Sequence, residues 1–123
     1  MIIRQAKKQD LAAILAILAI YEPEERALSL EEAEVIYKRI LLYPDYNIYV
    51  AVINNNVVAT FALAIMDNLA HMGSKSGLIE DVAVLPEFQG QGIGKAMMEY
   101  AINICREKIS FNFQKMQTIH RTE

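Results

Sequence analysis

In the last third of the chain stands the run Gln89-Gly90-Gln91-Gly92-Ile93-Gly94, and the stretches on either side of it decide the predicted fold. The stretch before it, Leu78–Leu85, is β-branched and apolar apart from two adjacent acids, and Pro86 ends this predicted strand. The stretch after it repeats apolar residues at the three- and four-residue spacing of one helical face. Glycines just before a helix let backbone N–H groups approach a ligand closely, so the turn predicts a phosphate or pyrophosphate site.

The same glycine-rich turn can also be only a tight connection between a strand and a helix, and its spacing alone leaves both interpretations open. The spacing does exclude two familiar phosphate-binding motifs. The dinucleotide fingerprint requires glycine at the position of Lys95, and the P-loop requires glycine at the position of Gln89.

The run from Val82 to Ala96 resembles the V-x-V-x-P-x-[YF]-[RQ]-G-x-G-[IL]-G signature of the GNAT superfamily of acyl-CoA-dependent N-acetyltransferases. The resemblance implies that backbone amides of the glycine turn wrap the pyrophosphate of coenzyme A. It also implies that the preceding strand offers free backbone groups to the pantetheine arm, with the Val82 N–H polarising the thioester carbonyl. The residues that it assigns to the binding of acetyl-CoA are Val82, Ala83, Val84, Gln89, Gly90, Gln91, Gly92, Ile93, Gly94 and Lys95.

The order of predicted elements is that of an α/β GNAT-like acyl-CoA N-acyltransferase fold, with a mixed, mostly antiparallel sheet flanked by helices. Ser29-Leu30-Glu31-Glu32 reads as a capping box that starts a helix running to about Leu42. Asn54-Asn55-Asn56 predicts the turn of a β-hairpin. The other predicted elements are a strand at Met1–Gln5, a helix at Asp10–Tyr21 and the two hairpin strands at Tyr46–Ile53 and Val57–Met66.

Two adjacent acids, Glu80 and Asp81, interrupt the apolar strand before the turn. Buried carboxylates are costly unless they are paired or used, and a structural role fits them as well as a catalytic one. The GNAT resemblance implies that an acid on this strand, often through water, removes the proton from the substrate ammonium. Strand alternation predicts the two acids on opposite faces, with Glu80 on the face of Val82 and Val84. Glu80 is therefore the first candidate for the base and Asp81 the second.

The C-terminal part departs from the family pattern. Ile109–Phe113 alternates well enough for a fifth strand, so a GNAT-like domain is expected over residues 1–113 and a polar tail over residues 114–123. The tail lacks the tyrosine that protonates the leaving thiolate in the family, and the chain resembles a member shortened at its C-terminus. An edge strand that carries Phe111 and Phe113 would expose apolar side chains and unpaired backbone groups, which predicts a homodimer through this region.

The composition bounds the remaining choices. A length of 123 residues with 54% hydrophobic residues indicates one domain. The net charge of −3 gives no reason to expect nucleic acid or an acidic membrane as a partner. The apolar run Leu11–Tyr21 is too short to span a bilayer. It follows basic residues as in a secretion signal, but Asp10 and the acidic segment at residues 22–25 argue against cleavage, so a cytoplasmic location is expected.

The single cysteine and the two histidines point to no further chemistry. Cys105 lies on the apolar face of the helix that follows the turn, where a buried, inert thiol is expected. His71 and His120 are not spaced with each other or with Cys105 as metal ligands, so no metal site is predicted.

These observations predict an enzyme that transfers acetyl from acetyl-CoA to a primary amine, on a small molecule or a peptide, by direct attack in a ternary complex. The alternative is a catalytically impaired CoA-binding domain, or a regulatory or interaction domain, on the same scaffold.

Overall fold

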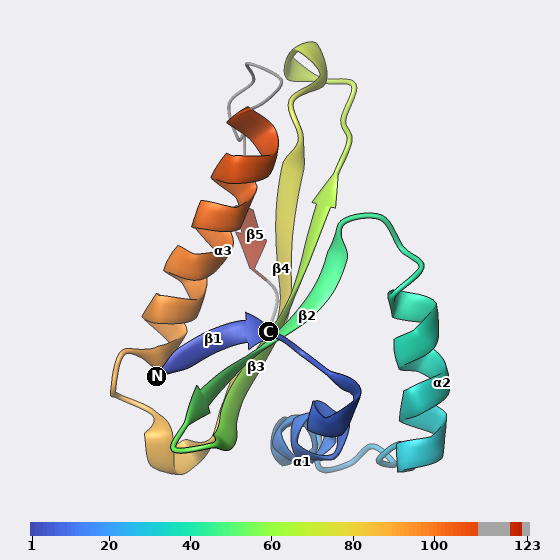
Figure 1. Ribbon diagram of the computed structural model, residues 1–123, viewed down its shortest axis with the longest axis vertical. Coiled ribbons are helices and arrows are strands. Elements are labelled where there is room, and N and C mark those ends of the chain that lie inside the picture. Colours follow the sequence, from blue (N-terminus) through green and yellow to red (C-terminus); the bar gives the residue numbers. More distant parts are fainter. Residues whose placement is uncertain (111–118, 122–123) are drawn as a thin grey trace.

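The computed structural model describes residues 1–110 and 119–121, and these form one sheet with helices on both faces (Figure 1). The strands follow the order β1-β2-β3-β4-β5; all neighbours are antiparallel except β4 and β5, which are parallel. The elements are β1 (Ile2–Gln5), η1 (Lys8–Asp10), α1 (Leu11–Tyr21), α2 (Leu30–Ile40), β2 (Tyr46–Ile53), β3 (Asn56–Met66), η2 (His71–Gly73), β4 (Ser76–Val84), η3 (Pro86–Phe88), α3 (Ile93–Ser110) and β5 (Ile119–Arg121).

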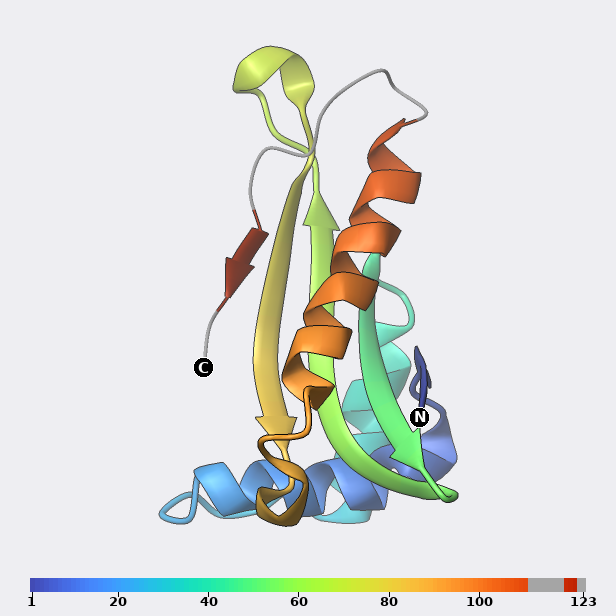
Figure 2. The same ribbon diagram turned by 90° about the vertical axis from the view of Figure 1, so that its left-hand side faces the viewer.

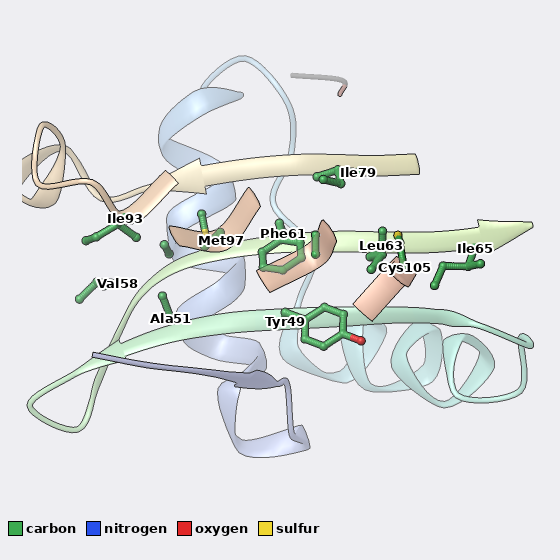
Figure 3. Close-up of a cluster of buried hydrophobic side chains, with 12 residues drawn as sticks. Tyr49, Ala51, Val58, Phe61, Leu63, Ile65, Ile79, Ile93, Met97 and Cys105 are labelled. Carbon is green, nitrogen blue, oxygen red and sulfur yellow. The ribbon is translucent and has the colours of Figure 1, made fainter. Parts of the chain in front are cut away.

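The helix α3 covers one face of the sheet and encloses the larger core (Figure 2). Met97, Ala101 and Cys105 on α3 pack against β3, where Phe61 and Leu63 are almost fully buried (Figure 3). Ala101 and Cys105 lie four residues apart, which is the helical spacing that the sequence predicts. Cys105 is buried as expected, and burial raises the pKa of its thiol.

The opposite face of the sheet is covered by α1 and α2. A smaller core forms there, in which Ile14 of α1 packs with Ala6 and with Val50 of β2. The helix α2 packs more thinly, since Ala33 is its one buried residue. None of the helices in the described ranges is both long enough and apolar enough to cross a membrane.

Two local predictions are confirmed. The Ser29 hydroxyl accepts a hydrogen bond from the Glu32 N–H at 3.1 Å, while the Glu32 carboxylate accepts from the Ser29 N–H at 2.9 Å, so the capping box starts α2. The hairpin turn between β2 and β3 has positive φ at Asn54 and Asn55, which asparagine tolerates better than most residues.

The C-terminal prediction is wrong in its details. The helix α3 runs to Ser110, so Ile109 and Ser110 are helical instead of starting a strand over Ile109–Phe113. The preceding residues Arg106–Lys108 are good helix formers, and the five-residue alternation was too short to outweigh them. Phe111–Phe113 lie outside the described residues. The fifth strand is β5, inside the segment expected to be a polar tail, and the homodimer through this region stays a prediction.

The start of α1 depends on Asp10, which is 7% exposed. Its carboxylate accepts hydrogen bonds from both Nη atoms of Arg4, at 2.7 and 3.1 Å, and from the Lys7 N–H at 2.7 Å. The hydrogen bonds from Arg4 lower the pKa of Asp10, although burial acts in the opposite direction. This ion pair therefore fastens β1 to the first turn of α1.

Asp10→Asn is expected to lower the free energy of unfolding by about 1–3 kcal/mol at pH 7, because Arg4 and the Lys7 N–H lose a charged acceptor. The folded pKa of Asp10 is depressed, so its contribution is present above the unfolded pKa of about 3.9 and is lost as the pH falls through the folded pKa. Urea denaturation from pH 7 to pH 3 measures this, and the difference between the two proteins should shrink as the pH falls below about 3.9. Glu34→Gln, which removes the 3.7 Å contact with exposed Lys8, serves as the control with an effect below about 0.5 kcal/mol.

Candidate active site

The turn between β4 and α3 needs glycine at two positions for conformational reasons. Gly90 and Gly92 have φ values of 79° and 81°, in the region that other L-residues rarely adopt. Gly94 lies inside α3 and has no such requirement. A Cβ atom built on any of the three glycines would meet nothing within 4 Å, so the backbone here borders open space.

The first turn of α3 offers backbone donors to that open space. The Ala96 N–H donates to the Gly92 carbonyl at 3.0 Å and closes the first turn. Within the described part of the chain, no hydrogen bond is donated by the N–H groups of Ile93, Gly94 or Lys95. These donors and the positive end of the helix dipole make the turn suitable for a phosphate group.

The outer edge of β4 is paired over only part of its length. The strand β3 pairs with β4 from Ser76 to Val84, whereas β5 pairs with it only at Gly77–Ile79. Beyond Ile79, the outer edge of β4 has no strand partner in the described ranges. An extended ligand with amide groups could therefore add to this edge as a further strand.

At its far end, this edge is tied to α1 and to the glycine turn. The Val84 carbonyl accepts hydrogen bonds from the Tyr21 hydroxyl and from Gln89 Nε2, the latter at 3.4 Å. Gln89 Nε2 also donates to the Tyr21 hydroxyl oxygen at 2.6 Å. Tyr21, which the sequence did not single out, thus connects the end of α1 to the candidate site.

A β-bulge at Asp81 changes the expected orientation of the two acids. Ala62 is the partner of Glu80, whereas Thr60 is the partner of Ala83, so β4 contains one residue more than β3 between these pairs. Asp81 has a φ of 54° and is the bulged residue. Simple alternation fails at such a residue. The prediction that Glu80 lies on the same face of the sheet as Val82 and Val84 is therefore wrong. Glu80 shares its face with Ala83 instead.

Both acids lie on the side of the sheet that α1 and α2 cover. Asp81 lines the same cavity as Tyr46, and Glu80 lies opposite Ala62, which also lines it. Burial raises the pKa of Tyr46, and the charges of Glu80 and Asp81 raise it further. The prediction of opposite faces is thus wrong, because the bulge brings the two carboxylates to one side.

A cavity of about 270 Å³ lies between α1, α2 and the sheet, and Asp81 is at its wall. Sequence reasoning missed this cavity, because its wall comes from segments far apart in the chain. The lining residues are Leu11, Ile14, Leu15 and Leu18 of α1; Leu28; Ala33, Ile36, Tyr37 and Ile40 of α2; and Tyr46, Ile48, Thr60, Phe61, Ala62 and Asp81 of the sheet.

The other polar residues considered from the sequence form no second site. His71 is exposed and lies in η2, which precedes the start of β4, at the end of this strand opposite to the glycine turn (Figures 1 and 2). Within the ranges that the structure describes, no group of three His, Cys, Asp or Glu residues is placed to hold a metal ion.

A strand with a bulge and an unpaired edge, followed by a glycine turn and a helix, defines the acyl-CoA N-acyltransferase class of folds. The chain belongs to the acetyltransferase (GNAT) family, whose family model matches residues 12–122. The expected family and fold class are therefore confirmed.

Solved structures agree with this assignment. A protein from Agrobacterium tumefaciens str. C58 that is assigned as an acetyltransferase has 25% sequence identity and a TM-score of 0.87, with 100% of this chain and 81% of that chain covered. A transcriptional regulator from Bacillus halodurans C-125 has 24% identity and a TM-score of 0.85, with 99% of this chain and 81% of that chain covered. A predicted acetyltransferase from Clostridium acetobutylicum, solved with acetyl-CoA, has 20% identity and a TM-score of 0.73, with 99% of this chain and 80% of that chain covered.

The two glycines Gly92 and Gly94 should respond differently to alanine in the ligand-free protein. Gly92→Ala is expected to lower the free energy of unfolding by about 1–2 kcal/mol, because alanine is strained at positive φ. Gly94→Ala should leave stability unchanged or raise it by up to about 1 kcal/mol, because alanine suits a helix better than glycine and its Cβ meets open space. Urea denaturation of both variants checks this, and equal effects would contradict the backbone geometry described for the turn.

Proposed function

We propose that this protein transfers the acetyl group of acetyl-CoA to a primary amine by direct attack in a ternary complex. The observation that carries the proposal is the joint presence of the unpaired β4 edge and the glycine turn at its end. The neighbouring fold solved with acetyl-CoA supports the choice of acyl donor.

The backbone supplies the donor site. Amides of Gly90 to Lys95 bind the pyrophosphate at the start of α3, whereas the Gln89 N–H already donates to the Pro86 carbonyl at 3.2 Å. The backbone of Val82, Ala83 and Val84 pairs with the pantetheine arm. The Val84 carbonyl accepts from Tyr21 and Gln89 in this structure, so a pantetheine amide must share or replace those donors. The Val82 N–H polarises the thioester carbonyl.

The two acids supply the base. A protonated amine has no lone pair with which to attack, so a carboxylate must take its proton first. The bulge removes the reason for ranking Glu80 above Asp81, and only Asp81 lines the cavity. We therefore place Asp81 first for an amine that enters from the cavity, and Glu80 second.

A second function is a CoA-binding or regulatory domain that has lost catalysis. The neighbour from B. halodurans described as a transcriptional regulator keeps this alternative open. Release of CoA thiol from acetyl-CoA over a panel of amines separates the two functions. Acetyl-CoA binding without thiol release for any amine would favour the regulatory domain.

Gly94→Glu is expected to weaken acetyl-CoA binding by roughly 10- to 100-fold or more, because a carboxylate enters the open space where the pyrophosphate would lie. An acid in the first turn of a helix suits the helix dipole, so the fold should persist. Titration calorimetry measures the affinity. Gly94→Gln is the control of equal size without charge, and its loss should be smaller. Unchanged affinity in both variants would show that the turn is only a connection.

Asp81→Asn is expected to lower the rate of acetyl transfer by roughly 10²- to 10⁴-fold with little change in acetyl-CoA affinity. Asparagine tolerates the positive φ of the bulge, so this variant removes the proton acceptor without straining β4. Steady-state thiol release is the measurement, and Glu80→Gln is the matched variant. A loss in Glu80→Gln alone would assign the base to Glu80, and full activity in both would exclude a carboxylate base on β4.

A further inference from the structure

The cavity beside Asp81 has mostly apolar walls. The helix α1 presents Leu11, Leu15 and Leu18 to it, and α2 presents Ile36 and Ile40. Apolar walls of this kind favour ligands by the apolar surface that they remove from water. The body of a bound molecule would therefore be selected by its hydrophobicity.

Two of the hydroxyl groups in the wall are already engaged within the protein. The Tyr37 hydroxyl donates to the Ala6 carbonyl at 3.3 Å, and the Thr60 hydroxyl donates to the Tyr49 carbonyl at 2.9 Å. Apart from a contact with the Tyr46 hydroxyl, a ligand body that carries several hydroxyl groups, such as a sugar, would compete with these bonds or remain without partners. Polar groups buried without partners weaken binding.

Among the residues that the structure describes, Asp81 is the only charged one that lines the cavity. A single ammonium group can pair with it, and no described Lys or Arg lines the cavity to oppose that pairing. A second ammonium held between α1 and α2, short of Glu22 and Glu25 in the adjoining cavity, would lie against leucine and isoleucine side chains, which cannot compensate a charge.

We propose that the acceptor is a small primary amine with an apolar, uncharged body, bound with its amine at Asp81 and its body between α1 and α2. This inference rests on the proposed acetyl transfer. The volume of about 270 Å³ lies just below the range for small-molecule sites, about 300–1,000 Å³, and suits a small acceptor.

The test compares amines of nearly equal shape. Propylamine is paired with ethanolamine, in which a hydroxyl replaces the terminal methyl group. Pentylamine is paired with 1,4-diaminobutane, in which an ammonium replaces it. Thiol release at saturating acetyl-CoA gives kcat/KM, with little background from buried Cys105. We expect the apolar member of each pair to be at least roughly tenfold better, and kcat/KM to rise about fourfold for each methylene from propylamine to pentylamine. Equal or better use of the polar members overturns the proposal.

A pair of adjacent residues on α2 provides matched variants. Ile36 lines the cavity, whereas Val35 is 56% exposed and does not line it. Ile36→Asn should lower kcat/KM for pentylamine by roughly tenfold and change that for ethanolamine little. Val35→Asn imposes a similar helix-propensity cost and should leave both values unchanged. Equal effects of the two variants on pentylamine overturn the proposal.

Failure of the proposed function is distinguishable from failure of this inference. If acetyl-CoA binds but none of the four amines releases thiol, acetyl transfer to such amines is refuted, and binding of pentylamine is then measured by ligand-observed NMR. Binding that Ile36→Asn abolishes and Val35→Asn preserves supports an apolar amine site. No binding to the wild-type protein overturns it.

Discussion

The free outer edge of β4 is the constraint on which the candidate site depends. A strand in the middle of a sheet normally satisfies its backbone groups on both sides, but within the described residues β4 has β5 beside it only at Gly77–Ile79. The segment from Glu80 to Val84 therefore keeps backbone groups for another partner. At Val84, the Tyr21 hydroxyl and Gln89 Nε2 already use one of them. Because Tyr21 is the last residue of α1, the geometry of the candidate site depends on this helix as well as on the sheet.

The bulge at Asp81 lies at the point where the outer pairing of β4 has ended. Its extra residue changes which side chains face α1 and α2, and it places Asp81 at the wall of the cavity. The same strand thus offers backbone groups at its edge and a carboxylate on its face. The proposed acyl transfer uses both, because the donor thioester and the acceptor amine must meet at one place.

Sequence patterns predicted the elements whose signals are local. The strand, glycine turn and helix were predictable because apolar spacing and positive φ at glycine are properties of neighbouring residues. The capping box of Ser29 and Glu32 was predictable for the same reason. The bulge was not, since Asp81 differs from its neighbours by a single backbone angle that no periodicity reveals. The pairing of β5 with β4 and the wall of the cavity depend on segments far apart in the chain, for which periodicity carries no signal.

The thin packing of α2 explains why a cavity remains beside the acids. Ala33 is the one buried residue of α2, so this helix closes the space above the sheet only partly. Other contacts of α2 are the Ser29 and Glu32 capping box with the exposed ion pair of Arg26 and Glu32 at 2.9 Å, and the hydrogen bond from the Tyr37 hydroxyl to the Ala6 carbonyl. A larger residue at position 33 or closer packing of Ile36 would fill the cavity and gain stability. Under the proposed function, this space is where the acceptor amine binds, and the packing that a filled cavity would add is given up for that binding.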